Sequence, residues 1–245
     1  MNINVNNLQE LIKKATLNYV IPSVHLNIQR DRVISKMRSQ GNSVVISLDL
    51  PNDVVTELPD EVDLYFDEPN VNVKPYLNLI DNDVVDLSVN TAGIVLKAGR
   101  HKTDLFFCMP STVTTFTGNT PNIQPFYELE LTNELKSNFD KIRKIAGKFE
   151  VVYFTVCDNK FIIETTDRSN RFMNGISFEL ATINVSNCDI CLDYKNFNAL
   201  LQVIDDNFTN FKVKFVWMDS QESGMVSFER NDGRENYYLL QKSED

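Results

Sequence analysis

Cys188 and Cys191 have the spacing of a metal-binding or redox pair. A structural zinc site needs four ligands, and neither a second such pair nor a nearby histidine supplies the missing two. Residues three apart on a strand also face opposite sides of a sheet. We therefore interpret both side chains as buried or half-buried thiols. The other cysteines, Cys108 and Cys157, are scattered along the chain, which fits a reducing compartment better than a disulfide framework.

The sequence gives little support for nucleophilic catalysis or for nucleotide binding. The two histidines, His25 and His101, lie in neither a serine-hydrolase nor a zinc-peptidase motif. No glycine-rich loop with the spacing of a phosphate-binding motif occurs. The 34 acidic residues are spread widely, so that a carboxylate pair could meet in space but no spacing marks one. We therefore expect a protein that is not an enzyme, with no catalytic residue, no metal and no cofactor.

Positive charge gathers on two predicted helices. The segment 132–148 carries five basic residues against two acidic ones, a net charge of +3. Its apolar residues Leu135, Phe139, Ile142 and Ala146 recur at helical spacing and form one face. Lysines point away from that face. The five basic residues are Lys136, Lys141, Arg143, Lys144 and Lys148. The helix predicted at 7–20 carries Lys13 and Lys14 away from its apolar stripe and has a net charge of +1.

The rest of the chain is strongly acidic. With a net charge of −10 overall and +4 on these two helices, the other residues carry −14. A lysine-rich helix face can be no more than a solvated surface, but two equivalent helices share the property here. A basic surface on an acidic molecule can hold a phosphate backbone weakly and independently of base sequence. These helices are therefore the candidate DNA-binding surface.

The elements that position these helices form an internal repeat. Each half opens with a basic helix, followed by three strand-like runs, then a strand, a second helix and three more strands. In the first half the strands are at 23–28, 33–36, 43–50, 62–66, 84–89, 94–97 and 104–109, with the second helix at 74–80. In the second half they are at 151–157, 161–165, 175–183, 188–192, 212–217, 225–228 and 235–241, with the second helix around 197–204. This order predicts an α+β protein with two similar domains, each with two strand-helix-strand modules.

Domain bounds follow from the repeat. We expect domain 1 at 1–109 and domain 2 at 126–245. The segment between them, 110–125, is rich in Thr, Ser, Asn, Pro and Gly and is typical of an exposed connecting loop.

The repeat resembles the sliding clamp family, which includes proliferating cell nuclear antigen and the T-even phage clamps. Besides the order of elements, two stretches carry the resemblance. One is Ser35-Lys36-Met37-Arg38-Ser39, and the other is Tyr237-Tyr238-Leu239-Leu240-Gln241-Lys242 followed by an acidic tail. The resemblance implies the DNA clamp fold, with helices lining a ring and sheets outside. It also implies a homotrimer that closes head to tail.

Two further surfaces come from the resemblance. The strand at 104–109 of one subunit would pair with 177–183 of the next, and the side chains packing there would be Phe106, Phe107, Phe178 and Leu180. An ordinary place in the core is the alternative for these four. A pocket for partner peptides would use Met37, Ile123, Phe126, Leu239 and Leu240. The usual proline of the closing strand is replaced by Leu240 or Gln241, and the second helix of each half carries only one lysine, Lys74 or Lys195.

The implied function is that of a DNA sliding clamp, a processivity factor with sequence-independent double-stranded DNA, a DNA polymerase and a clamp loader as partners. Two alternatives remain: a monomeric polymerase accessory subunit, and an acidic viral structural or DNA-mimic protein. No run approaches the roughly 18 apolar residues that cross a bilayer, and the polar N-terminus lacks a secretory pattern. We therefore expect an intracellular protein at the replication fork, with no membrane partner.

Overall fold

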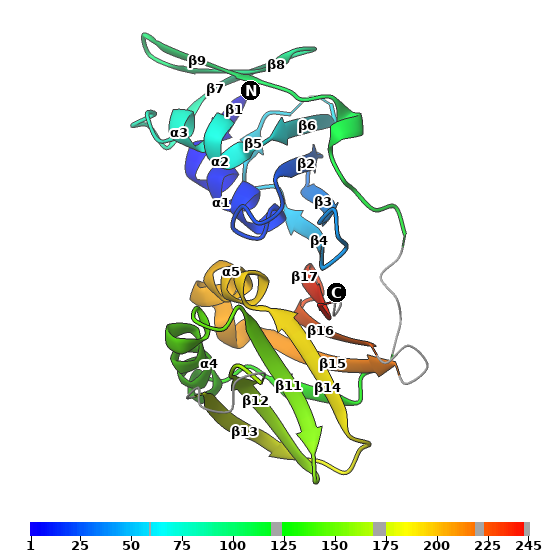
Figure 1. Cartoon of the computed structure of the whole chain (residues 1–245). Helices are drawn as coiled ribbons and strands as arrows, with labels where there is room; N and C mark the ends of the chain where they lie inside the picture. Colours follow the sequence, from blue (N-terminus) through cyan, green and yellow to red (C-terminus); the bar gives the residue numbers. More distant parts are fainter. Residues whose placement is uncertain (59, 119–123, 169–174, 219–222, 243–245) are drawn as a thin grey trace. The chain divides into compact units, whose positions relative to one another are not determined.

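The structure, a computed structural model, describes all residues except 59, 119–123, 169–174, 219–222 and 243–245 (Figure 1). The chain divides into two compact units. Unit 1 comprises Met1–Gly41 and Val45–Gly118, and unit 2 comprises Asn42–Val44 and Asn119–Asp245. Within the described residues, no helix is long and apolar enough to span a bilayer.

Unit 1 has two antiparallel sheets and a helical layer. One sheet has the order β4 (Val44–Pro51), β3 (Arg32–Arg38), β2 (Ser23–Ile28) and β6 (Val62–Asp67). The other has the order β5 (Val55–Thr56), β1 (Asn2–Asn4), β7 (Val84–Asn90), β8 (Gly93–Ala98) and β9 (His101–Phe106). The helices are α1 (Val5–Ala15), α2 (Pro69–Asn72) and α3 (Lys74–Leu77), with a 3-10 turn η1 (Pro110–Thr112) near the end of the unit.

Unit 2 repeats this plan. One sheet has the order β13 (Ile176–Thr182), β12 (Lys160–Thr165), β11 (Val151–Cys157) and β14 (Cys188–Asp193). The other contains β10 (Tyr127–Glu130), β15 (Phe211–Met218), β16 (Ser223–Arg230) and β17 (Glu235–Leu240), in that order. The helices are α4 (Asn133–Ala146) and α5 (Tyr194–Ile204), the latter followed by η2 (Asp205–Asn210). The matching strand orders confirm the predicted repeat and the α+β class.

The two helices of unit 2 begin where short polar side chains cap them. The Thr132 side chain accepts a hydrogen bond from Leu135 N at 3.2 Å, and Asp193 accepts from Lys195 N at 2.8 Å. Such caps stabilise a helix by about 1 kcal/mol each. They fix the first turn of α4 and of α5, and with it the direction in which each helix presents its polar face.

An aromatic cluster joins the helical layer of unit 2 to both sheets. Phe139 of α4 and Phe197 of α5 pack edge to face, with ring centroids 5.7 Å apart. Phe197 in turn contacts Phe154 of β11 at 5.9 Å, and Phe154 contacts Phe215 of β15 at 5.1 Å. All four side chains are fully buried. Aromatic pairs of this geometry contribute about 0.5–1.5 kcal/mol each beyond their buried area. The cluster therefore stabilises the packing of α4 and α5 against the sheets.

The helix predicted at 74–80 is present but shorter, because α3 ends at Leu77, and a separate short helix that was not predicted, α2, precedes it at Pro69–Asn72. Glu68, which precedes α2, has the left-handed φ of 42°, and Val73, which separates the helices, has the non-helical pair φ −123° and ψ −57°. Both helices have proline in the first turn, where it fits a helix start. The hydrophobic period of the sequence does not indicate the non-helical backbone at Val73 that separates α2 from α3.

The strand predicted at 104–109 is shifted. β9 spans His101–Phe106, because the hairpin turn at Gly99, with φ of 60°, lets pairing with β8 begin at His101. After Phe106 the chain leaves β8: Cys108 N donates to Tyr65 O of β6 at 3.0 Å. The first residues of the predicted exposed loop at 110–125 pack against unit 1, since Arg38 N of β3 donates to Thr114 O at 3.1 Å and Val113 is buried.

Candidate nucleic-acid interface

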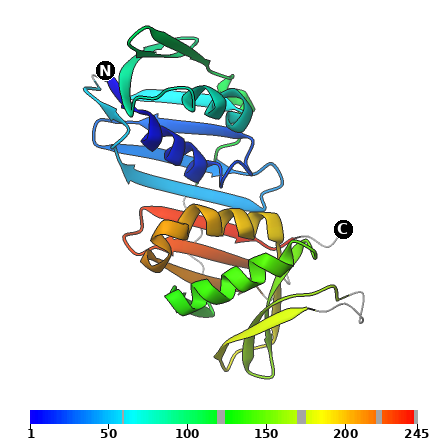
Figure 2. The same ribbon diagram turned by 90° about the vertical axis from the view of Figure 1, so that its left-hand side faces the viewer.

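Three exposed lysines of unit 2 gather at the second half of α4 and just after it, and α4 lies on the helix side of the sheets (Figure 2). Lys141, Lys144 and Lys148 are all exposed. Among the described residues, no carboxylate lies within ion-pair distance of any of these three ammonium groups. Lys141 Nζ donates to Asn138 Oδ1 at 3.3 Å and lies 5.5 Å from the centroid of the Phe178 ring. The three lysines therefore present positive charge that no carboxylate of the described residues compensates.

The other two basic residues predicted on α4 are partly neutralised. Lys136 Nζ lies 2.9 Å from Asp205 Oδ1 and 5.9 Å from the centroid of the Phe208 ring. Arg143 Nη1 lies 3.0 Å from Asp140 Oδ1. Each of these cations is less than a third exposed, whereas its carboxylate partner is more open. The field that α4 presents to an anion is therefore weaker than its count of basic residues indicates.

Helix α1 of unit 1 presents less charge. Lys13 Nζ lies 3.4 Å from Glu10 Oε2, and both Lys13 and Lys14 are only half-exposed. Lys74 of α3 lies 4.9 Å from the centroid of the Tyr19 ring. Burial, and to a smaller extent the Glu10 carboxylate, raise the pKa of Tyr19 above its ordinary value, so this ring stays neutral. Lys195, on the second helix of unit 2, is exposed.

Of the four residues predicted at a subunit interface, three lie on edge strands, and Phe107 directly follows one of them. β9 and β13 are each the last strand of their sheet in the described residues. Phe106 of β9 is 73% exposed, whereas Phe107 is half-buried and its ring lies 5.7 Å from that of Phe66. Phe178 and Leu180 of β13 are also half-buried. Phe106 is thus the member of the set with the largest apolar surface left in solvent.

The residues predicted to line a peptide pocket are placed unevenly. Met37 of β3 is fully buried, and its sulfur accepts a hydrogen bond from His25 N at 3.4 Å. Leu239 is 1% exposed and pairs with Val226 inside unit 2, whereas Leu240 and Phe126 are half-buried. Ile123 lies outside the described residues. In unit 2, Leu240 and Phe126 are therefore the accessible members.

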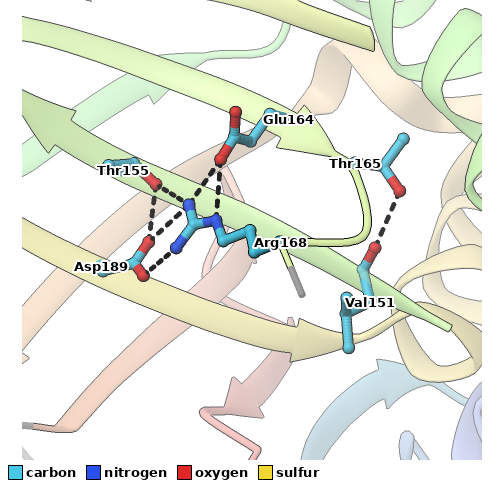
Figure 3. A network of polar contacts seen from close by, with 6 residues as sticks. All are labelled: Val151, Thr155, Glu164, Thr165, Arg168 and Asp189. Carbon is cyan, nitrogen blue, oxygen red and sulfur yellow. Dashed lines mark hydrogen bonds and ion pairs between the residues drawn. The ribbon is translucent and has the colours of Figure 1, made fainter. Parts of the chain in front are cut away.

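A polar network on β11, β12 and β14 was not predicted (Figure 3). Arg168 follows β12 and stacks on the Tyr153 ring, 3.7 Å from its centroid. Its guanidinium pairs with Asp189 and donates from Nε to Glu164 Oε1 at 3.0 Å. Burial works to lower the pKa of Arg168, but these two carboxylates raise it above its ordinary value. The network fixes Arg168 to the sheet. Glu164 is only four positions away in sequence, but Tyr153 and Asp189 are too distant for a local pattern to indicate their contacts.

The described residues contain no cluster of three or more metal-ligating side chains. Cys188 is buried and Cys191 half-buried on opposite faces of β14. Burial, and then the nearby Asp189 carboxylate, raise the pKa of the Cys191 thiol, so it is not an activated nucleophile.

Solved structures of three proteins share this fold. The proliferating cell nuclear antigen of A. fulgidus, in a complex with the C-terminal region of FEN-1, is similar over 100% of this chain and 98% of its own, with TM-score 0.65 and 14% identity. The proliferating cell nuclear antigen of Entamoeba histolytica is similar over 99% of this chain and 98% of its own, with TM-score 0.66 and 10% identity. For the DNA polymerase III β subunit of Thermotoga maritima the shares are 99% and 64%, with TM-score 0.65 and 11% identity.

No family model matches the sequence, and no curated protein matches it. Identities of 10–14% with these structures establish the fold and leave the activity to be argued. The chain has the fold of the sliding clamps, which confirms the architecture that the resemblance implied.

Proposed function

We propose that this protein is a DNA sliding clamp, a processivity factor that encircles duplex DNA and tethers the replicative DNA polymerase. The observation that carries the proposal is the gathering of exposed, uncompensated lysines on α4 of a chain with the clamp fold and a net charge of −10. An acidic surface repels phosphates, so the helix face is where this molecule can accept them. The role needs no catalytic residue and no cofactor.

The proposed mechanism is topological. A closed ring stays on DNA without tight contacts, so affinity need not come from base recognition. Lys141, Lys144 and Lys148 are mobile point charges that attract the backbone in a salt-dependent and sequence-independent way. A polymerase held by the ring remains at high effective concentration near its primer. Loading onto circular DNA requires the ring to open, which makes a clamp loader the expected partner.

Ring closure is proposed to join β9 of one subunit to β13 of the next in a homotrimer. Unpaired strand edges invite pairing with another chain. Beside β9 a hollow of about 740 Å³ is lined in part by Tyr76, Leu79 and Phe106, which are 49%, 72% and 73% exposed. Large apolar side chains exposed together at a strand edge are typical of an interaction site. A second copy of the chain, offering β13 with Phe178 and Leu180, is the occupant that we propose.

The site for partner peptides is proposed around Leu240 and Phe126. Leu240→Ser should weaken binding of a peptide from the polymerase tail while the subunit stays folded, because Leu240 is half-buried. Leu239→Ser should instead destabilise unit 2 by about 2–5 kcal/mol, because this side chain is in the core. Unchanged peptide affinity in a folded Leu240→Ser protein would place the pocket elsewhere.

The test of the proposed function is native mass followed by retention on DNA. Mass measured by light scattering over a range of concentrations should reach three times 28.1 kDa. The ring, once loaded, should remain on closed circular DNA and slide off when the circle is cut. A monomer at every concentration that still stimulates the polymerase would favour the accessory-subunit alternative. Absence of both DNA binding and stimulation would favour the DNA-mimic alternative.

A further inference from the structure

A hollow of about 340 Å³ opens between α4 and α5 of unit 2, and its lining contains the one arginine of α4. The lining residues are Asp140, Arg143, Lys144 and Asn198. Figure 2 shows the two helices side by side on the helix side of the sheets. The hollow therefore lies beside the exposed lysines of the proposed DNA-binding face.

Arg143 is held in one orientation, unlike its lysine neighbours. Its Nε donates to Asn198 Oδ1 at 3.0 Å, and its Nη1 donates to Asp140 Oδ1 at 3.0 Å. Its backbone oxygen accepts a hydrogen bond from the Tyr194 hydroxyl at 2.8 Å. Asn198 of α5 and Asp140 of α4 together fix where the guanidinium points, and Tyr194 of α5 holds the backbone of the same residue.

The held guanidinium still has unused donors. A guanidinium carries five N–H groups, and the contacts to Asn198 and Asp140 occupy two of them. In the described part of the chain, no other acceptor satisfies the remainder. A planar fork of N–H groups matches the oxygens of a phosphate better than a lysine ammonium does. The hollow is thus a cationic site with a fixed guanidinium that can bind an anion the size of a phosphate. We call this site the seat.

In unit 1, a hydrogen bond between α1 and the end of α3 carries no charge. Gln9 Nε2 of α1 donates to Asn78 Oδ1, at the end of α3, at 3.1 Å. An amide pair of this kind joins two helices but does not attract an anion. The seat is therefore a property of unit 2 among the described residues.

We propose that this hollow seats one phosphodiester group of the duplex, with Arg143 as its donor and Asn198 as a positioning residue. Asp140 shares the charge of Arg143 and keeps the contact weak, so that the ring can move from one phosphate to the next. The inference rests on the proposed function, because it assigns a role to one contact within the proposed DNA-binding face. It adds two residues, Asn198 and Asp140, that carry no positive charge.

The test is the salt dependence of binding to a short labelled duplex of mixed sequence, measured by fluorescence anisotropy. Arg143→Ala should reduce the slope of log K against log salt by up to about 0.9, the value for one phosphate contact. Asp140→Asn should raise affinity at every salt concentration, because the competing carboxylate charge is removed. Lys160→Ala, which removes an exposed lysine at the start of β12 that pairs with Glu179, is the control and should leave the slope unchanged.

A double-mutant cycle separates positioning from general stability. Asn198→Leu should weaken binding in the wild-type background and have no further effect in the Arg143→Ala background. Arg143→Lys keeps one positive charge and should therefore keep the slope, but it lacks the Nε that Asn198 holds. Asn198→Leu should consequently have no effect in that background either.

Three outcomes would overturn the inference. Additive losses from Asn198→Leu and Arg143→Ala would refute the positioning role. An unchanged slope in Arg143→Ala, together with weaker binding when Lys141, Lys144 and Lys148 are replaced by Ala, would refute the seat and leave the proposed function standing. Absence of salt-dependent duplex binding in the wild type would refute both.

Discussion

Replacing Phe106 with alanine should weaken assembly of the ring without unfolding the subunit. Phe106 is 73% exposed on the edge strand β9. A phenylalanine side chain offers about 150–250 Å² for burial, so about 110–180 Å² of it remains available to a partner. At about 25 cal/mol per Å² this area is worth about 3–4.5 kcal/mol when fully covered. Loss of about 3 kcal/mol would raise the dissociation constant of each interface on the order of 100-fold.

The assay is analytical ultracentrifugation of the wild type and of Phe106→Ala over a wide range of concentrations. The midpoint between monomer and trimer should move to higher concentration in the variant. The urea midpoint of the monomer should change little, because exposed side chains contribute within about 0.5 kcal/mol. Val84→Ala is the matched control, since Val84 is 55% exposed on β7 of the same sheet and away from its edge. An unchanged assembly midpoint in Phe106→Ala would refute the assignment of β9 to the interface.

Three further predictions test charge and stability. Replacing the four cations at the second half of α4 and just after it by alanine should lower polymerase stimulation and reduce the salt slope of duplex binding by about 0.9 per lost contact, with the subunit folded and assembled. Unchanged stimulation at physiological salt would move the DNA-binding face elsewhere. The four are Lys141, Arg143, Lys144 and Lys148. Burial works to raise the pKa of Asp63, but hydrogen bonds from Asn27 and His25 hold that pKa below its ordinary value of 3.8. This carboxylate therefore contributes stability above about pH 4 that is lost as it is protonated, and Asp63→Asn should flatten the fall of the urea midpoint on acidification; equal curves would show no contribution. Tyr237→Phe should lower the free energy of unfolding by about 1–3 kcal/mol, because it removes the 2.7 Å hydrogen bond to the buried Glu235 carboxylate; an unchanged urea midpoint would contradict this.

The elements that the sequence predicted best are those with a strong local period. Helix α4 follows from the recurrence of Phe139, Ile142 and Ala146, which are its buried residues. The strands predicted at 84–89 and 94–97 correspond to β7 and β8, and Asn90 forms the turn between them, since its side chain accepts hydrogen bonds from Ala92 N and Gly93 N at 2.8 and 3.0 Å. In both cases residues within a few positions of one another determine the structure.

The elements that the sequence predicted poorly depend on distant partners. β9 ends at Phe106 because the chain leaves β8 for Tyr65 of β6, which is 43 positions from Cys108 in sequence. Arg168 meets Asp189 across two strands, 21 positions apart. A local window contains neither partner, so no period or propensity could have indicated these contacts.

On the candidate DNA-binding face of α4 too, the sequence predicted what depends on local spacing and missed what depends on distant partners. The amphipathic pattern of α4 indicated which side carries the cations, and Lys141, Lys144 and Lys148 are exposed there. The pattern gave no sign of which cations are already compensated, because the carboxylate of Lys136 is Asp205, 69 positions away. Ion pairs with solvent-exposed partners are weak and exchange readily, so a passing phosphate can compete for these cations too.

The difference between the uncompensated lysines and the held arginine matters for sliding along DNA. Uncompensated lysines give long-range attraction that depends little on position. An arginine that Asp140 and Asn198 already hold offers a directed contact, but a phosphate must compete with the carboxylate to use it. A face with only uncompensated lysines would attract the DNA backbone without fixing the position of the protein along it. A face with only fixed arginines would hold the protein at one position along the duplex and slow its sliding. The combination on α4 and α5 favours a contact that forms and breaks as the duplex moves.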